Sequence, residues 1–218
     1  MRLAPQRSGR PADCRRADPP CRRATGRLVI VIQPYRASWP GEFQTLRAHL
    51  AAVLGGHARH IAHIGSTAVP GMAAKDVIDV QIGVERLDPG VADLLTGAGY
   101  NFVARIDRDH VPPGAAAAEA DWRKLYCRGR TGERPSHIHV RALGSANHRY
   151  ALLFRDYLRA HAGQRLAIEA IKRELARRHA HDAEAYYSVK DPVYDLVWHA
   201  ANDWAARAGW RPDAAAEA

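Results

Sequence analysis

The chain has 218 residues, of which 47% are hydrophobic and 25% charged. These proportions are ordinary for a globular protein, and a chain of this length can bury a large core without disulfides. No apolar run approaches the roughly 20 residues that a membrane-spanning helix needs, so we expect no membrane partner. The net charge of +9 is uneven, because residues 1–27 hold eight Arg against two Asp and contribute +6. The remaining +3 makes nucleic acid an unlikely partner for the body of the protein.

The N-terminal segment differs from the rest in composition. Residues 1–27 combine Pro and Arg with almost no periodic apolar pattern, which predicts a disordered basic tail. Residues 28–210 are expected to form one domain, and residues 211–218 a disordered C-terminus. The three cysteines (Cys14, Cys21 and Cys127) have neither zinc-site nor disulfide spacing, which favours reduced thiols and a cytoplasmic protein.

The first two thirds of the chain alternate strand and helix patterns. A β-branched run over 28–33 predicts a first strand, and apolar residues at helical spacing predict a helix over 38–54. The clearest strand covers 77–84, where strict alternation places Asp79 and Gln81 opposite the apolar face. The same criteria predict strands over 60–64, 100–106, 122–127 and 136–142, and a helix over 87–98.

The last third of the chain has helical spacing throughout. Helices are predicted over 147–161 and 166–175, followed by a short helix capped by Asp182. A fourth helix is expected to open at Asp191-Pro192, since Pro is unfavourable inside a helix. A mixed sheet followed by a helical section indicates the α+β class.

Two features around the predicted strand 77–84 could carry chemistry. Gly65-Ser66 lies at a strand end, where Gly lets a backbone approach a phosphate and Ser supplies an N–H and a hydroxyl. Asp79 is a lone carboxylate in an apolar strand, which is costly unless it is paired or binds a metal. Lys75 would suit an anionic ligand as a point charge. The plain alternatives are a solvated strand face for Asp79 and a solvated loop for Lys75.

A third feature is the alternation of His137, His139 and Arg141 along one strand. The period of two sends these three side chains to the same face. Two imidazoles can ligate a metal or, together with an Arg, bind phosphate; the alternative is a polar, solvated face. If this strand lies beside the strand over 77–84, the two His and Asp79 share one side of the sheet.

Together these segments resemble the GrpB family. The match is carried by the eighteen residues HIGSTAVPGMAAKDVIDV at 63–80. Shorter matches are VIQPY at 31–35, Trp39-Pro40, HIHV at 137–140, FRDYLR at 154–159, Ile171-Lys172, and Tyr187 with Lys190. The resemblance covers about residues 28–210.

The resemblance implies a nucleotidyltransferase-like mixed β-sheet with flanking helices and a C-terminal helical section. In that superfamily a Gly-Ser pair holds nucleotide phosphates, and carboxylates on following strands bind two metal ions. Gly65-Ser66 and Asp79 match the phosphate pair and the first carboxylate. The chain departs from the pattern at Gln81 and at His137 and His139, which replace further acids. This leaves a single divalent metal, Mg²⁺ or Mn²⁺, or a metal-free nucleotide site.

The resemblance therefore implies three groups of site residues. The catalytic candidates are Asp79, Ser66 and Lys75. The candidates for binding phosphate or nucleotide are His63, Gly65, Ser66, Thr67, Lys75, Lys124, Arg141 and Arg155. The candidate metal ligands are Asp79, His137 and His139.

The implied function is that of an intact or degenerate nucleotidyltransferase-like enzyme that binds a nucleotide or another phosphorylated small molecule. In some actinobacterial proteins a GrpB-like domain follows a dephospho-CoA kinase domain. The alternative is therefore a non-catalytic ligand-binding or accessory module with a coenzyme A biosynthesis kinase as partner. Kinase activity of its own is not expected, because the chain has no Gly-x-x-x-x-Gly-Lys-Ser/Thr loop. Nucleic-acid binding through the Arg-rich tail is a third, weaker reading.

Overall fold

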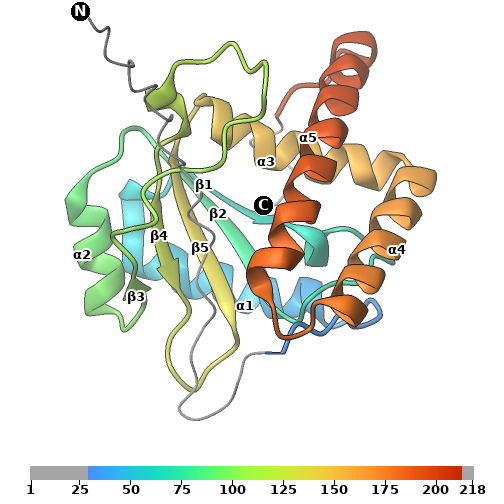
Figure 1. The fold of residues 1–218 in the computed structure, drawn as a ribbon. Coiled ribbons are helices and arrows are strands. Elements are labelled where there is room, and N and C mark those ends of the chain that lie inside the picture. The colour runs from blue at the N-terminus through green and yellow to red at the C-terminus, as the bar shows by residue number, and fades with distance from the viewer. Residues whose placement is uncertain (1–28, 213–218) are drawn as a thin grey trace, which may run out of the picture.

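The computed structural model describes residues 29–212; the predicted N-terminal tail and most of the predicted C-terminal tail lie outside the described residues. A mixed five-stranded sheet in the order β1-β2-β5-β4-β3 forms the centre, with helices on both faces (Figure 1). The strands are β1 His60–Ile64, β2 Ile78–Val84, β3 Asn101–Phe102, β4 Leu125–Arg128 and β5 Ser136–Ala142. The helices are α1 Trp39–Leu54, α2 Pro89–Gly97, α3 Ala146–Ala160, α4 Ala162–Arg178 and α5 Ala183–Ala208. This confirms the α+β class and the helical last third.

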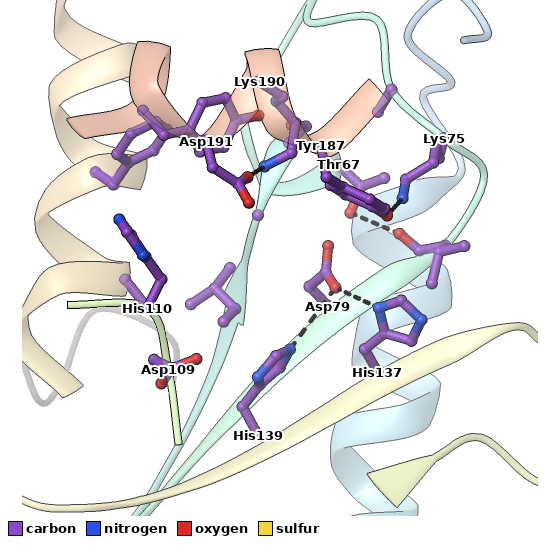
Figure 2. A pocket seen from close by; sticks show the side chains of 18 of the residues that line it. Thr67, Lys75, Asp79, Asp109, His110, His137, His139, Tyr187, Lys190 and Asp191 are labelled. Atoms are coloured by element: carbon purple, nitrogen blue, oxygen red, sulfur yellow. Dashed lines mark hydrogen bonds and ion pairs between the residues drawn. The ribbon is translucent and has the colours of Figure 1, made fainter. Parts of the chain in front are cut away.

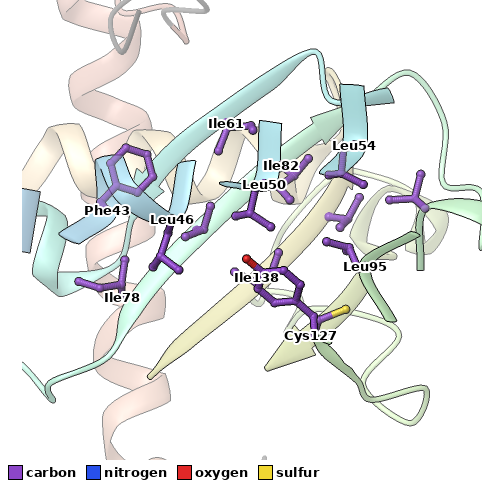
Figure 3. Packing of buried hydrophobic residues seen from close by; sticks show 14 of the residues in the cluster. Phe43, Leu46, Leu50, Leu54, Ile61, Ile78, Ile82, Leu95, Cys127 and Ile138 are labelled. Carbon is purple, nitrogen blue, oxygen red and sulfur yellow. The ribbon is translucent and has the colours of Figure 1, made fainter. Parts of the chain in front are cut away.

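One face of the sheet is apolar and carries the main core. Helix α1 begins with Pro40 in its first turn and buries one stripe of side chains, including Phe43 and Leu50. This stripe packs on the inward residues of the central strands, such as Ile78, Ile82 and Ile138 (Figure 3). Helix α2 closes the same core. The alternation predicted for the strand over 77–84 is confirmed, because its apolar positions all face α1 and α2.

The pairing of β2 with β5 positions the polar face. The two strands are parallel neighbours, and Asp79 is the register partner of His137, while Gln81 is that of His139. Strand β1 pairs antiparallel with β2 on its other side and ends beside it, with Ile64 opposite Asp79. The Asp79 carboxylate, the two imidazoles and the end of β1 therefore lie close together on the polar face, toward one end of the strands.

Helices α3, α4 and α5 stand over this second face. Leu152 of α3 packs on Ala62 and Ile64 of β1. Contacts between α3 and α5 and between α4 and α5 join the three helices into one group. A cavity separates α5 from the polar ends of β2 and β5 (Figure 2).

The predicted first strand is wrong. In the described part of 28–33, only Gln33 makes a β-bridge, with Ala74. Instead, the Ile30 N–H donates to the Ala180 carbonyl, and the Ile30 side chain packs with Leu175 among the C-terminal helices. Through Ile30, the segment thus packs against the C-terminal helices instead of joining the sheet. The strand predicted over 100–106 is also shorter, at Asn101–Phe102.

The predicted helix break at Pro192 is wrong as well. Helix α5 runs without interruption from Ala183 to Ala208. The lost backbone hydrogen bond is offset by packing on both sides of Pro192, because Tyr186 before it and Ala201 and Ala205 after it are buried. Continuity matters because Tyr187, before Pro192, and Tyr194, after it, lie on one helix that stands over the polar face (Figure 1).

None of the described helices combines the length and the apolarity that a bilayer crossing requires.

Candidate functional site

A cavity of about 320 Å³ lies between the polar face of the sheet and the C-terminal helices (Figure 2). Ligand pockets in proteins begin at roughly 300 Å³. The cavity is lined by residues from both sides, among them Gly65, Ser66, Thr67, Lys75, Asp79, Asp109, His137, His139, Arg141, Phe154, Lys172, Tyr186, Tyr187, Lys190 and Tyr194. Its size and mixed polar and aromatic lining suit a small molecule.

The turn after β1 forms one end of the cavity. Gly65 has φ +70° and ψ −172°, a conformation that is essentially restricted to glycine. A Cβ atom at this position would overlap Asp79 Oδ2 and lie 2.9 Å from Asp79 Cγ. The Asp79 carboxylate therefore sits directly against the backbone of the turn. Glycine is required here for conformation and for space.

Asp79, His137 and His139 converge as the strand alternation predicts. His137 Nδ1 lies 3.1 Å from Asp79 Oδ1, and His139 Nε2 lies 3.9 Å from the same oxygen. One ligand atom from each residue falls within 4.8 Å of the others. The Asp79 side chain is 28% exposed. Burial alone would raise the pKa of Asp79, but the hydrogen bond from His137 and the nearby positive charges lower it.

The surroundings of His139 define its protonation. Its Nδ1 atom lies 3.4 Å from Lys124 Nζ and 3.4 Å from the Arg141 guanidinium, and both of these groups can only donate. Burial and the neighbouring cations lower the pKa of His139 well below its usual value. The ring is therefore neutral, with Nδ1 as acceptor and the proton on Nε2, which faces Asp79.

Asp109 is a site residue that the sequence analysis missed. Its Oδ1 accepts a hydrogen bond from Lys124 Nζ at 2.7 Å, and its Oδ2 accepts from Arg141 Nε at 2.8 Å and from Asn147 Nδ2 at 3.0 Å. Burial would raise the pKa of Asp109, but Arg141 and Lys124 hold it far below its usual range. Asp109 lies in a loop between short strands, and no local pattern marks it.

This network changes the expected roles of Lys124 and Arg141. Their side chains are only 6% and 5% exposed, and both pair with the single carboxylate of Asp109. Both also contact Nδ1 of His139, so they help to hold Asp109 and His139 in place. Arg141 lines the cavity and Lys124 does not, so a role in binding phosphate stays a prediction for Arg141 and loses support for Lys124.

Gln81 has a structural reason to be an amide. It is fully buried, its Oε1 accepts from Arg141 Nη1 at 2.6 Å, and its Nε2 donates to the His148 carbonyl at 3.2 Å. A carboxylate could accept the first bond but could not donate the second. Gln81, which stands where the family resemblance would place a second acid, therefore forms a polar bridge between β2 and α3.

Two other expected phosphate ligands support the Gly65-Ser66 turn from behind. His63 stacks on Phe43 at 4.7 Å and contacts Thr67 Oγ1 at 3.0 Å, and burial lowers its pKa to about 4. Arg155 donates to the His63 carbonyl at 3.0 Å. Neither His63 nor Arg155 lines the cavity, whereas Thr67 does.

The helices add lysines that the sequence analysis gave no role. Lys172 Nζ donates to Ser66 Oγ at 2.9 Å and to the Ala73 carbonyl at 2.8 Å. Lys190 Nζ lies 3.9 Å from the ring centroid of Tyr194. The position of Lys172 held a signal, because it falls on the buried stripe of α4 between Ile168 and Leu175. A lysine on an apolar stripe indicates a buried charge.

Lys75 and Ser66, two of the predicted site residues, both line the cavity. Lys75 Nζ donates to Tyr187 OH at 2.5 Å (Figure 2). The Ser66 hydroxyl, besides accepting from Lys172, forms a hydrogen bond with Tyr194. Burial would raise the pKa of Tyr194, but Lys172, Lys190 and the bond to Ser66 lower it.

The donor set discriminates between metal ions. One carboxylate and two imidazoles suit ions that accept nitrogen ligands, such as Mn²⁺ or Zn²⁺, whereas Mg²⁺ prefers oxygen ligands alone. Ligating imidazoles commonly donate their second N–H to an acceptor, and Nδ1 of His139 faces two cations instead. Asp79 and His137 are thus the better placed ligands.

The chain is similar in sequence to a known protein family and to several known proteins. The GrpB protein family model matches residues 29–199. A dephospho-CoA kinase from Mycolicibacterium paratuberculosis is 34% identical over 204 residues, which cover 87% of this chain and 50% of that protein. The chain thus spans about half the length of these kinase-named relatives.

Two further matches cover most of the length of the matched protein. UPF0157 protein SCO7215 from Streptomyces coelicolor is 33% identical over 168 residues, covering 76% of this chain and 81% of that protein. The crystal structure of the conserved protein GrpB from Enterococcus faecalis has the same fold, with a TM-score of 0.60 at 23% identity over 80% of this chain and 99% of that one. The resemblance predicted from the motif at 63–80 is confirmed, and the chain belongs to the GrpB family.

Proposed function

We propose that the cavity binds a nucleotide or another phosphorylated small molecule, and that the protein is a nucleotidyltransferase-like enzyme. One observation carries the proposal: the Gly65-Ser66 turn and the Asp79 carboxylate touch each other at one end of a cavity of ligand size. The superfamily pattern pairs a phosphate-binding Gly-Ser turn with an acid on the next strand. In this chain the two elements meet in space as that pattern requires.

The roles of the lining residues follow from their surroundings. Asp79 is ionised at neutral pH, since its pKa is lowered, and it can accept a proton or hold a cation. His137 orients it through a hydrogen bond, and neutral His139 directs an N–H toward it. Lys75 and Lys172 supply positive charge in the lining of the cavity.

A divalent ion belongs to the proposal, with Mn²⁺ or Zn²⁺ favoured over Mg²⁺ by the nitrogen ligands. Asp79 and His137 would hold it, with His139 as a third ligand if its ring proton moves to Nδ1. Bound there, the ion would polarise a phosphoryl oxygen of the ligand.

A second candidate function is a non-catalytic ligand-binding module. It is favoured by one finding: relatives named dephospho-CoA kinase are about twice as long as this chain. In that case the domain would bind a phosphorylated ligand or accompany a separate kinase partner. Metal-dependent turnover separates the two candidates, because a binding module shows none.

The test measures thermal stability with a panel of nucleotides and divalent ions. A ligand at a hundred times its dissociation constant should stabilise the protein by about 2.7 kcal/mol. The Asp79→Asn variant should lose this shift, because the amide neither holds a cation nor accepts a proton. Its own stability should change by about 1 kcal/mol or less, since the carboxylate is partly exposed and its loss leaves no buried charge unpaired.

Asp203→Asn is the matched control, because Asp203 is an exposed residue of α5 outside the cavity lining. This variant should keep the full ligand shift. If the wild type shows no shift with any nucleotide or ion, or if Asp79→Asn responds as the wild type does, the proposed function is wrong.

A further inference from the structure

All four lysines of the chain lie in the cavity lining or next to it. Of its 32 basic residues, four are Lys and the others are Arg. Three of the four (Lys75, Lys172 and Lys190) line the cavity, and the fourth, Lys124, contacts His139 in its lining. Every other basic position in the sequence carries a guanidinium. All four side-chain ammonium groups of the chain are therefore found in the cavity lining or in contact with it.

Lys172 is a buried ammonium group that forms no ion pair with a described carboxylate, and Glu169, one turn earlier on α4, acts on it only at longer range. The residue is 4% exposed, and its two hydrogen-bond partners, Ser66 Oγ and the Ala73 carbonyl, are neutral. Within the described residues no carboxylate lies within 4.0 Å of Lys172 or of Lys75. An uncompensated ammonium in such a place costs free energy. By contrast, Arg141 and Lys124 in the same region each form an ion pair, with the shared carboxylate of Asp109.

The three cavity lysines are arranged around two tyrosines of α5. Lys75 and Lys190 lie 4.9 Å and 5.3 Å from the ring centroid of Tyr187, and Figure 2 shows them at either end of its side chain, above Asp79. Lys172 reaches the same region from α4 through Ser66, which also bonds to Tyr194. Lys190 is the one of the three that has an acidic partner, Asp191 at 2.6 Å.

We propose that Lys75, Lys172 and Lys190 form a subsite for a doubly charged phosphate group, a phosphate monoester or the end of a diphosphate. This inference rests on the proposed function and specifies the ligand class of the same cavity. Lys75 and Lys172, which form no direct ion pair with a described carboxylate, match two negative charges. The Ser66 hydroxyl then also positions Lys172, in addition to the place of Ser66 in the phosphate-binding turn.

The subsite also requires ammonium instead of guanidinium. Lys172 Nζ donates two bonds in a buried position, and a compact ammonium can turn its remaining proton toward a ligand. The larger planar guanidinium would have to displace Ser66 or the Ala73 carbonyl. The substitution of Arg for Lys172 should therefore be as damaging as the loss of the charge.

The experiment measures binding of pyrophosphate and inorganic phosphate by calorimetry, with ionic strength held constant by NaCl because screening affects all charged contacts. The wild type should bind pyrophosphate. The variants Lys172→Met and Lys172→Arg should each weaken binding by about tenfold or more, the loss expected for one charge-assisted contact. Arg177→Met is the control, since Arg177 is an exposed residue of the same helix, and its affinity should stay within about twofold.

Stability provides a second readout. Lys172→Met should melt at the same or a higher temperature than the wild type, because it removes a buried charge that no acid compensates. If this variant does not fold, Lys190→Met carries the binding test, since the Lys190 side chain is more accessible.

Two outcomes overturn the subsite: a wild type that binds neither anion, or Met variants that bind pyrophosphate as the wild type does. The first proposal fails separately. If pyrophosphate binding depends on the lysines but no nucleotide or metal shift depends on Asp79, the subsite stands and the nucleotidyltransferase-like function does not. If nucleotides bind through Asp79 and the lysines make no difference, the function stands and the subsite is wrong.

Discussion

Replacing Asp109 with Asn should lower the free energy of unfolding by about 3–5 kcal/mol, the cost of leaving buried charges without their partner. The variant keeps the shape of the side chain, but Lys124 and Arg141 lose their only carboxylate within ion-pair distance among the described residues. Denaturant unfolding measures the change. Asp107→Asn is the matched control, because Asp107 pairs with Arg108 at an exposed position, and it should cost about 1 kcal/mol or less.

The same variant predicts a change in pH dependence. The pKa of Asp109 is lowered in the folded protein, so its contribution to stability is present above the unfolded value of about 4 and is lost as the pH falls below it. The stability difference between wild type and Asp109→Asn should therefore shrink below about pH 4. Buried His63 and His148 also destabilise the protein between pH 6.5 and about 4, but both are present in each variant and cancel. A difference that is independent of pH would contradict the ion-pair account.

The second large effect is expected for Gly65→Ala. The backbone conformation of Gly65 costs about 1–3 kcal/mol for any other residue. The added Cβ would also overlap the Asp79 carboxylate. We therefore expect a lower melting temperature together with loss of ligand binding, because either the turn or Asp79 must move.

Gly144→Ala separates these two causes. Gly144 also has a positive φ, +77°, but an added Cβ there meets no atom within 4 Å. Gly144→Ala should lose stability through strain alone and keep ligand binding in the thermal-shift assay. If Gly65→Ala binds ligand as well as Gly144→Ala does, the contact between the turn and Asp79 is not needed for the site.

Local patterns predicted most of the polar face. Alternation in the strands over 77–84 and 136–142 was sufficient to send Asp79, His137 and His139 away from the apolar core. The fact that these strands are parallel neighbours, with Asp79 opposite His137, depends on the pairing of distant segments. The sequence could state this only as a condition. The structure fulfils it.

The helical half of the site could not be assigned from local patterns. Lys172 reaches Ser66 from 106 residues along the chain, and Lys75 meets Tyr187 across 112 residues. Such contacts are set by how α4 and α5 fold back over the sheet. The same packing explains the two errors in element prediction. It keeps α5 continuous across Pro192, and it draws the segment around Ile30 onto the C-terminal helices instead of into the sheet.

The roles of single residues also required the tertiary structure. Lys124 and Arg141 are predicted phosphate ligands, yet in the structure both pair with the carboxylate of Asp109. Asp109 lies in an irregular loop, where neither periodicity nor spacing marks a residue as buried. Gln81 reads as a lost acid until its two hydrogen bonds show that only an amide satisfies both neighbours.

Amide ¹H–¹⁵N NMR spectra recorded during a titration with ATP show whether the ligand binds between the sheet and α5. The largest shifts should come from the turn Gly65–Thr67 and from α5 between Tyr187 and Tyr194, because both border the cavity. Amides of α2, on the opposite face of the sheet, should stay in place. Shifts confined to α2 or to surface loops, or no shifts at all, would contradict the account.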